Sequence, residues 1–249
     1  MEGSDVVQVT KTAAEPVLFC WSGGKDSCMA LHELRRDPLR EVVALLTTVT
    51  EGFDRISMHG VRRILLERQA AALGLPLEIV TIPPKCVNTE YESRMEAMLL
   101  TWKAHGITEV AFGDIFLEDL REYRERNLAR VGMKTLFPVW KQPTDKLVRD
   151  FIAQGFRALT VCVDPKILDE SFVGREIDAE FLAALPAAAD PCGENGEFHS
   201  FVYDGPGFSA PVKFTIGEKV LRDGFYFCDL LPADAGAQPS RVQDVTLSA

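Results

Sequence analysis

The sequence predicts an α/β protein with a parallel sheet that carries helices on both faces, followed by a smaller C-terminal α+β domain. Up to about residue 140, short apolar runs alternate with segments of helical spacing, which is typical of strands joined by crossover helices. Beyond Asp164, glycine and proline become frequent and two segments alternate like antiparallel strands. A chain of 249 residues with 47% hydrophobic content can bury the core of both parts.

Each element of the first part has its own signal. Residues 16–21 form an apolar run that predicts a strand, and residues 28–35 are amphipathic and predict the first helix. Residues 90–105 predict a helix that Gly106 ends. The same criteria predict strands at 41–48, 77–82, 109–112 and 134–137, and helices at 61–73 and 117–131.

The second part is predicted to contain strands at 198–203, 213–218 and 225–230. Both ends of the chain are polar or rich in small residues, so we expect them to be disordered. The resulting division is a tail at 1–15, a main domain at 16–164, a smaller domain at 165–232 and a tail at 233–249.

A glycine-rich turn, S-G-G-K-D-S at residues 22–27, joins the first strand to the first helix. Adjacent glycines let successive N–H groups point inward, and the positive end of the helix dipole adds to the attraction for an anion. The turn therefore predicts a phosphate cradle. Its spacing is not that of the Walker A motif, so an ordinary P-loop kinase or GTPase is excluded. The residues assigned to the phosphates are Ser22, Gly23, Gly24, Lys25 and Ser27.

A second motif, C-G-E-N-G-E-F-H-S at residues 192–200, places two carboxylates and an imidazole among glycines. Glu194 and Glu197 can flank a metal or hold an amine, and His199 can move a proton near neutral pH. The alternative is a glycine-rich turn that leads into a strand and leaves both glutamates solvated.

Charge and cysteine distribution exclude several classes of protein. A net charge of −10 argues against broad binding to nucleic acid, which needs clustered Lys and Arg. The six cysteines form no C-x-x-C pair, so neither a zinc knuckle nor a thioredoxin-type site is predicted. No apolar stretch approaches the ~20 residues that span a bilayer, and the polar start lacks the apolar region of a signal peptide. We therefore expect a cytoplasmic protein without a membrane partner.

Together, the early S-G-G-K-D-S turn and the late G-E-N-G-E-F motif resemble those of the diphthine–ammonia ligase family of N-type ATP pyrophosphatases. The resemblance covers roughly residues 16–231. It implies a Rossmann-like fold of the adenine nucleotide alpha hydrolase type, with ATP and Mg²⁺ as cofactors. It also implies an amidation in which a carboxylate is adenylated, pyrophosphate leaves and ammonia displaces AMP. In that family the carboxylate belongs to diphthine, a modified histidine on elongation factor 2.

Several positions are more similar to the bacterial branch of the family. These are Asn195 and His199 in the late motif, G-D-I-F-L-E-D at 113–119 with Tyr123-Arg124, and S-M-H-G-V-R at 57–62. Bacteria are not expected to make diphthamide, so the expected acceptor is another carboxylate, on a small molecule or a protein. The chain begins Met-Glu rather than Met-Cys, so we expect ammonia to arrive free.

The remaining candidate residues are assigned with alternatives. Asp26 can cap the first helix or reach Mg²⁺. Asp114, with Gly113 at the ligand edge of the sheet, can hold Mg²⁺ or the activated carboxylate, or can simply form a turn. His59 and Arg62 can contact adenine and a phosphate, or can be a capping histidine and a solvated arginine. Glu194 and Glu197 are assigned to ammonium or substrate.

Two other functions use the same early turn. A tRNA-modifying ATP pyrophosphatase would need basic surface for RNA, which this acidic chain lacks. A non-catalytic adenine-nucleotide-binding module would keep the cradle and transfer nothing. The intact Lys25, Asp26 and Ser27 and the acidic late motif favour an active ligase.

Overall fold

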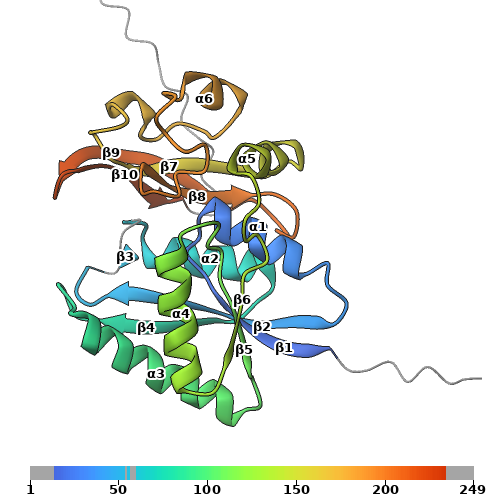
Figure 1. Cartoon of the computed structure of the whole chain (residues 1–249). Helices are drawn as coiled ribbons and strands as arrows, with labels where there is room; N and C mark the ends of the chain where they lie inside the picture. Colours follow the sequence, from blue (N-terminus) through green and yellow to red (C-terminus); the bar gives the residue numbers. More distant parts are fainter. Residues whose placement is uncertain (1–13, 54, 57–59, 234–249) are drawn as a thin grey trace, which may run out of the picture.

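The computed structural model describes residues 14–53, 55–56 and 60–233, and it shows two sheets with helices packed between them (Figure 1). The first sheet has the hydrogen-bonding order β3-β2-β1-β5-β6, and β4 also pairs with β2. All pairings in it are parallel except that of β3 with β2. Its strands are β1 (Glu15–Cys20), β2 (Arg40–Thr50), β3 (Arg55–Ile56), β4 (Leu77–Ile82), β5 (Glu109–Ala111) and β6 (Lys134–Leu136).

Both faces of the first sheet are covered, as predicted. On β1, Val17 and Phe19 join the core formed with α1 (Lys25–Leu34) and α2 (Arg63–Leu73). Leu18, between them, joins a second core formed with α3 (Asn88–Ala104) and α4 (Glu118–Arg130). A strand that is buried on both faces needs apolar side chains at successive positions. The apolar run at residues 16–21 therefore predicted this strand correctly.

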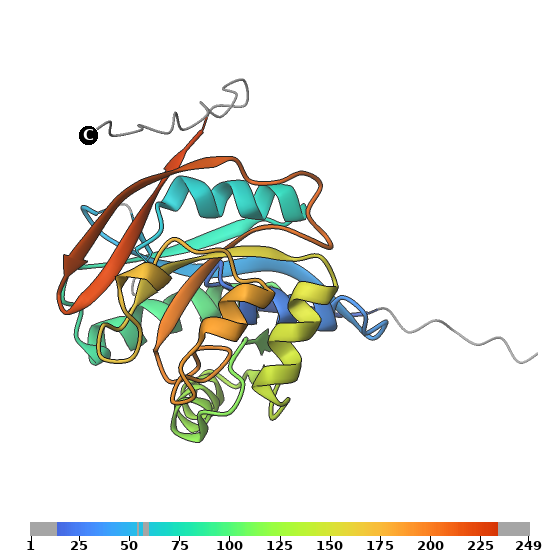
Figure 2. The ribbon, with the colours of Figure 1, turned by 90° about the horizontal axis from the view of Figure 1, so that it is seen from above.

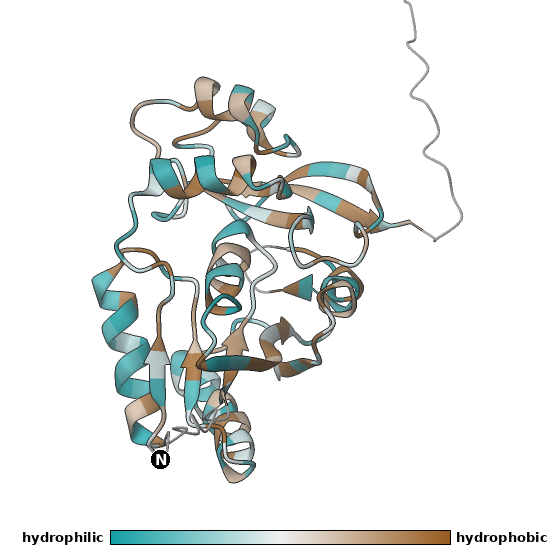
Figure 3. Cartoon of the chain, turned by 90° about the vertical axis from the view of Figure 1, so that its right-hand side faces the viewer, coloured by the Kyte–Doolittle hydropathy of each residue, from teal (hydrophilic) through white to brown (hydrophobic). Residues whose placement is uncertain are grey.

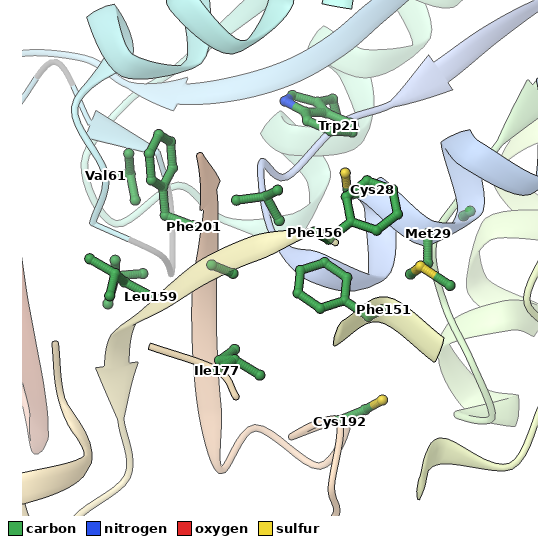
Figure 4. Packing of buried hydrophobic residues seen from close by; sticks show 14 of the residues in the cluster. Trp21, Cys28, Met29, Val61, Phe151, Phe156, Leu159, Ile177, Cys192 and Phe201 are labelled. Atoms are coloured by element: carbon green, nitrogen blue, oxygen red, sulfur yellow. The ribbon is translucent and has the colours of Figure 1, made fainter. Parts of the chain in front are cut away.

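The second sheet is antiparallel, with the order β8-β7-β10-β9. One apolar core extends from α1 and α2 into this sheet, and Figure 4 shows Met29 of α1 together with Leu159 and Phe201 of the second sheet among its members. The strands and the accompanying helices are β7 (Arg157–Val163), β8 (Phe198–Asp204), β9 (Phe214–Arg222), β10 (Phe225–Pro232), α5 (Thr144–Ala153) and α6 (Ala179–Ala184).

The boundary between the two sheets lies earlier in the chain than Asp164, where the sequence analysis placed the domain boundary. β7 pairs with β8 and β10, so it belongs with the C-terminal strands although it was placed in the first domain. A buried strand does not carry a signal for its pairing partner, which is why this membership was not read from the sequence. The change from one sheet to the other falls within residues 137–156. The tails at 1–13 and 234–249 lie outside the described residues, and Glu15, assigned to the first tail, begins β1.

A tight hairpin joins β9 to β10 at one side of the molecule (Figure 2). Asp223 and Gly224 both have positive φ, at 51° and 84°, as a two-residue type I′ turn requires. The turn sets Arg222 opposite Phe225.

The outer surfaces of the helices are largely hydrophilic, whereas apolar residues concentrate on the strands and the helix faces that cover them (Figure 3). In the part of the chain that the structure describes, no helix combines the length and the apolar character needed to cross a membrane.

Candidate active site

A cleft of about 600 Å³ opens where β1 and β5 end and where β8 begins. Three segments that the sequence singled out form its walls, namely the 22–27 turn, the turn after β5 and the late motif. Parallel strands direct their carboxyl ends to one edge of a sheet, which is why the first two segments meet. The predicted residues that line the cleft are Ser22, Gly24, Lys25, Asp26, Ser27, Gly113, Asp114, Glu194 and His199.

The 22–27 turn is held in shape by its own hydroxyls. Ser22 Oγ accepts from the Gly24 N–H at 3.2 Å and lies 3.0 Å from Ser27 Oγ, which donates to the Gly24 carbonyl at 3.0 Å. Gly23 has a φ of 78°, and a Cβ there would lie 2.7 Å from Gln69 Oε1. Both the backbone conformation and the crowding require glycine at this position.

Gly113 has a packing role in addition to the predicted contact with nucleotide. A Cβ at Gly113 would lie 2.7 Å from the backbone nitrogen of Ser27 and 2.8 Å from its Cα. Glycine therefore allows the chain after β5 to approach the first turn of α1.

Lys25 is the buried cation of the site, with only 3% of its side chain exposed. Its Nζ donates to both carboxylate oxygens of Asp26 at 2.8 Å and to the Cys192 carbonyl, and it lies 5.1 Å from the centre of the Phe198 ring. Burial disfavours the charge, but the Asp26 carboxylate outweighs it, so the pKa of Lys25 is raised and the ammonium persists.

Asp26 does not cap the first helix. Helix α1 begins at Lys25, its N-cap is Gly24, and no side chain caps it. The capping alternative is therefore wrong, because the Asp26 carboxylate is directed to Lys25 instead.

Asp114 lies at the cleft but already has a cationic partner. Arg124 donates to its two oxygens at 2.5 and 3.1 Å, and the guanidinium also lies 4.4 Å from the centre of the Phe112 ring. No pattern in the sequence indicated that these two residues pair, although Arg124 was noted together with residues 113–119. Within residues 14–53, 55–56 and 60–233, no three His, Cys, Asp or Glu side chains gather as a metal site.

Glu197 is not brought to the cleft. Only 4% of the residue is exposed, and its carboxylate accepts from the Asp190 N–H at 2.9 Å and from the backbone and side-chain nitrogens of Asn195 at 3.0 and 3.1 Å. These bonds shape the 190–197 loop. The expectation that Glu197 handles substrate is therefore corrected: its oxygens are occupied within the loop that presents Glu194.

Glu194 reaches from this loop to the turn after β5. Its Oε1 accepts from the N–H groups of Ile115 and Phe116 at 2.8 and 3.3 Å. Burial raises the pKa of Glu194 to about 7, although the two N–H donors oppose the shift. A carboxylate that faces the cleft and titrates near neutral pH can exchange protons there. Neither glutamate is a solvated turn residue.

His199, on β8, lines the cleft as an uncharged imidazole. Burial, together with the nearby Lys25, lowers the pKa of His199 to about 4. The expectation that it titrates near neutral pH is therefore wrong. As a neutral ring it can still donate or accept a hydrogen bond.

Arg62 is not among the residues that line the cleft. Its guanidinium donates to Asp229 on β10 at 2.7 and 3.1 Å, and Arg55 donates to the same carboxylate at 2.8 Å. Partial burial raises the pKa of Asp229, but the two arginines lower it further, to about 2. Arg62 thus ties the start of α2 to the second sheet instead of contacting a phosphate. His59, the other candidate of this segment, lies outside the described residues.

The sequence analysis did not identify Gln69 and Ser200, which hold the 22–27 turn in place through hydrogen bonds. Gln69 is fully buried; its amide donates to the carbonyls of Gly23 at 2.9 Å and Val202 at 2.5 Å, and its oxygen accepts from Trp21 Nε1 at 3.1 Å. From β8, Ser200 Oγ accepts the N–H of Lys25 at 3.0 Å. The only signal in the sequence was a glutamine on the apolar face of the helix expected at 61–73.

Both parts of the chain match domains of one known family. Residues 15–135 match the diphthamide synthase N-terminal domain, and residues 143–231 match the diphthamide synthase C-terminal domain. The diphthine–ammonia ligase of Mus musculus is 27% identical over 228 residues, which cover 83% of this chain and 85% of the relative. That of Homo sapiens is 25% identical over 229 residues, with the same two coverages. The chain therefore belongs to the diphthine–ammonia ligase family.

Proposed function

We propose that this protein is an ATP-dependent amide ligase that adenylates a carboxylate, releases pyrophosphate and transfers ammonia, leaving AMP. The observation that supports this best is the convergence of both family motifs on one cleft, with the buried Lys25 beneath it and Glu194 at its wall. The relatives named diphthine–ammonia ligase support the amide-forming step.

ATP fits the cleft with its phosphates on the 22–27 turn. The N-terminus of α1 and the buried Lys25 ammonium both favour a polyanion there. Other parts of the wall are apolar and include Tyr91, Met95, Leu117 and Leu120, which suit an aromatic base. The volume of about 600 Å³ lies in the range typical of ligand sites.

Magnesium is a further part of the proposal. Asp26 and Asp114 are the carboxylates of the cleft that can reach a nucleotide-bound ion, and phosphate oxygens and water would supply its other ligands. When bound, Mg²⁺ neutralises charge on the leaving pyrophosphate. Because each carboxylate also pairs with a cation, Lys25 or Arg124, the ion depends on ATP for most of its affinity.

The first prediction concerns the products. With a carboxylate acceptor, ammonia and Mg²⁺, the protein should convert ATP to AMP and pyrophosphate and form an amide. Nucleotides resolved by ion-exchange chromatography and a pyrophosphate assay test this directly. ADP and orthophosphate would contradict the proposed cleavage site. ATP binding without any turnover across acceptors would favour the non-catalytic binding module instead.

The second prediction concerns Glu194, whose ionised form we assign to holding or deprotonating the incoming ammonium. Free ammonia becomes more abundant as pH rises, so both wild type and Glu194→Gln should become faster. The ratio of the wild-type rate to the Glu194→Gln rate cancels this effect and should rise between about pH 6 and pH 8, with a midpoint near the pKa of about 7.

Glutamine at 194 can still accept from the N–H groups of Ile115 and Phe116, so the loop should keep its position. Steady-state rates of amide formation at saturating ATP measure the ratio. A ratio that does not change with pH would exclude a role for the Glu194 carboxylate in ammonia transfer.

A further inference from the structure

A second cavity, of about 410 Å³, adjoins the nucleotide cleft. It lies between the turn that follows β2 and the tip of the β9–β10 hairpin. Ile56 and His199 line both spaces, so the two cavities share a wall at these residues. Of the two motifs identified in the sequence, only the late one reaches this second cavity, through His199.

The lining of this cavity is mainly apolar. Phe53, Phe225 and Phe227 contribute three rings, and Phe53 is 62% exposed although it is large and apolar. An exposed aromatic ring beside a cavity is typical of a site that buries an apolar ligand.

Arg222 supplies the available positive charge. Its guanidinium lies 4.6 Å from the centre of the Phe227 ring, and its ion-pair partner among the described residues is Asp223, at 3.9 Å, with side chains that are 50% and 90% exposed. Such a long, exposed pair contributes little and leaves the cation able to bind another anion. Arg55, the second arginine of the cavity, is already committed to Asp229 and to the Gly60 carbonyl.

Arg222 also lies near the wall that the two cavities share. Cys162 pairs with His199 across β7 and β8, and the positive charge of Arg222 acts on the Cys162 thiol, partly opposing the rise in its pKa that burial causes. Phe227, whose ring centre lies 4.6 Å from the Arg222 guanidinium, pairs with Cys162 across β10 and β7, so a carboxylate bound by Arg222 would lie near the wall that the two cavities share. His199 is neutral at this position and does not compete with Arg222 for the anion.

We propose that this cavity binds the acceptor, and that the acceptor is a small amphipathic carboxylic acid. Its apolar body packs among Phe53, Phe225 and Phe227, and its carboxylate pairs with Arg222 before it reaches the nucleotide. The inference rests on the proposed amide-ligase function. A volume of about 410 Å³ suits a small molecule, and the cation and aromatic rings select for one that carries both an acid and an apolar group.

Calorimetry on the full-length protein without ATP tests the cavity by itself, with 3-phenylpropanoate as the probe. Acetate lacks the apolar body, and 3-phenylpropanamide lacks the charge. Wild type should bind 3-phenylpropanoate about tenfold or more tightly than either, since burial of the ring and a charge-assisted contact each contribute on this scale. Arg222→Gln should bind 3-phenylpropanoate and 3-phenylpropanamide with similar affinity. Phe225→Ala should bind 3-phenylpropanoate and acetate with similar affinity.

The control variant is Leu221→Ala, on the same strand but 61% exposed and outside the cavity. It should bind 3-phenylpropanoate as wild type does. The proposal is overturned if wild type binds 3-phenylpropanoate no more tightly than acetate, which is the result expected if the acceptor is carried on a protein. It is also overturned if Arg222→Gln and Phe225→Ala both bind 3-phenylpropanoate as tightly as wild type does. A parallel loss of ATP affinity in Arg222→Gln would also overturn it, by placing the residue in the nucleotide site.

Failure of the ligase function gives a different result. If the acid binds through Arg222 and Phe225 but neither it nor related acids stimulate pyrophosphate release, the cavity assignment stands and the amide-ligase function fails.

Discussion

Lys25→Met is expected to lower both ATP affinity and the rate of pyrophosphate release by about tenfold or more. The substitution removes a buried cation from the phosphate cradle, and charge-assisted contacts contribute about 1.5–3 kcal/mol each. It also leaves the Asp26 carboxylate without its partner at 2.8 Å, so that a negative charge faces the triphosphate. Isothermal titration with ATP and a pyrophosphate assay measure the two effects.

The fold must be shown to survive this change, because Lys25 also donates to the Cys192 carbonyl. Methionine keeps most of the volume of the side chain, and thermal unfolding reports any loss of stability. Lys166→Met, at an exposed position in the loop after β7, is the matched control and should leave both measurements unchanged. Wild-type ATP affinity in a folded Lys25→Met protein would rule out the phosphate-cradle assignment.

Gln69→Leu is expected to lower the free energy of unfolding by about 2–4 kcal/mol, since each buried polar group left without a partner costs about 1–3 kcal/mol. Leucine removes the partners of Trp21 Nε1 and of the Val202 carbonyl, both in the interior. The Gly23 carbonyl loses the Gln69 donor but still accepts from the Val202 N–H at 2.9 Å. Urea denaturation measures the effect, and ATP affinity should fall with it because the turn loses its support from α2.

Gln154→Leu provides the matched control for this prediction. Its Oε1 is buried without a hydrogen-bond partner, so the same replacement removes no hydrogen bond and should change the stability by less than about 1 kcal/mol. If the two variants lost equal stability, the bonds of Gln69 to the turn would have no special importance.

The parts of the site that were predictable are those formed by residues close together in the chain. The 22–27 turn is one example, since its glycines, its lysine and the following helix all lie within one short segment. The different roles of Glu194 and Glu197 could not be predicted, because the two residues stand three positions apart in the same motif and have the same side chain. Glu194 faces the cleft through bonds to residues 115 and 116, while Glu197 bonds inside its own loop. Nothing in the local pattern distinguishes the two.

The same reasoning applies to the fold. Strands buried on both faces were found from their apolar runs, and Asp223-Gly224 formed a hairpin between two segments that were expected to be strands. The sheet to which β7 belongs, the partner of Arg62 on β10 and the link from Gln69 to Val202 depend on pairings between distant segments. Such pairings leave no periodicity in the sequence.

The bonds from β8 to the 22–27 turn have a consequence for synthesis of the chain. Lys25 and Ser200 are 175 residues apart, so the turn at residues 22–27 lacks the support of β8 until most of the chain has left the ribosome. Contacts of such long separation form slowly, because a large loop of chain must close first. We therefore expect a nascent protein that ends before β8 to remain unable to retain nucleotide, so that ATP is engaged only once synthesis of the second sheet is under way.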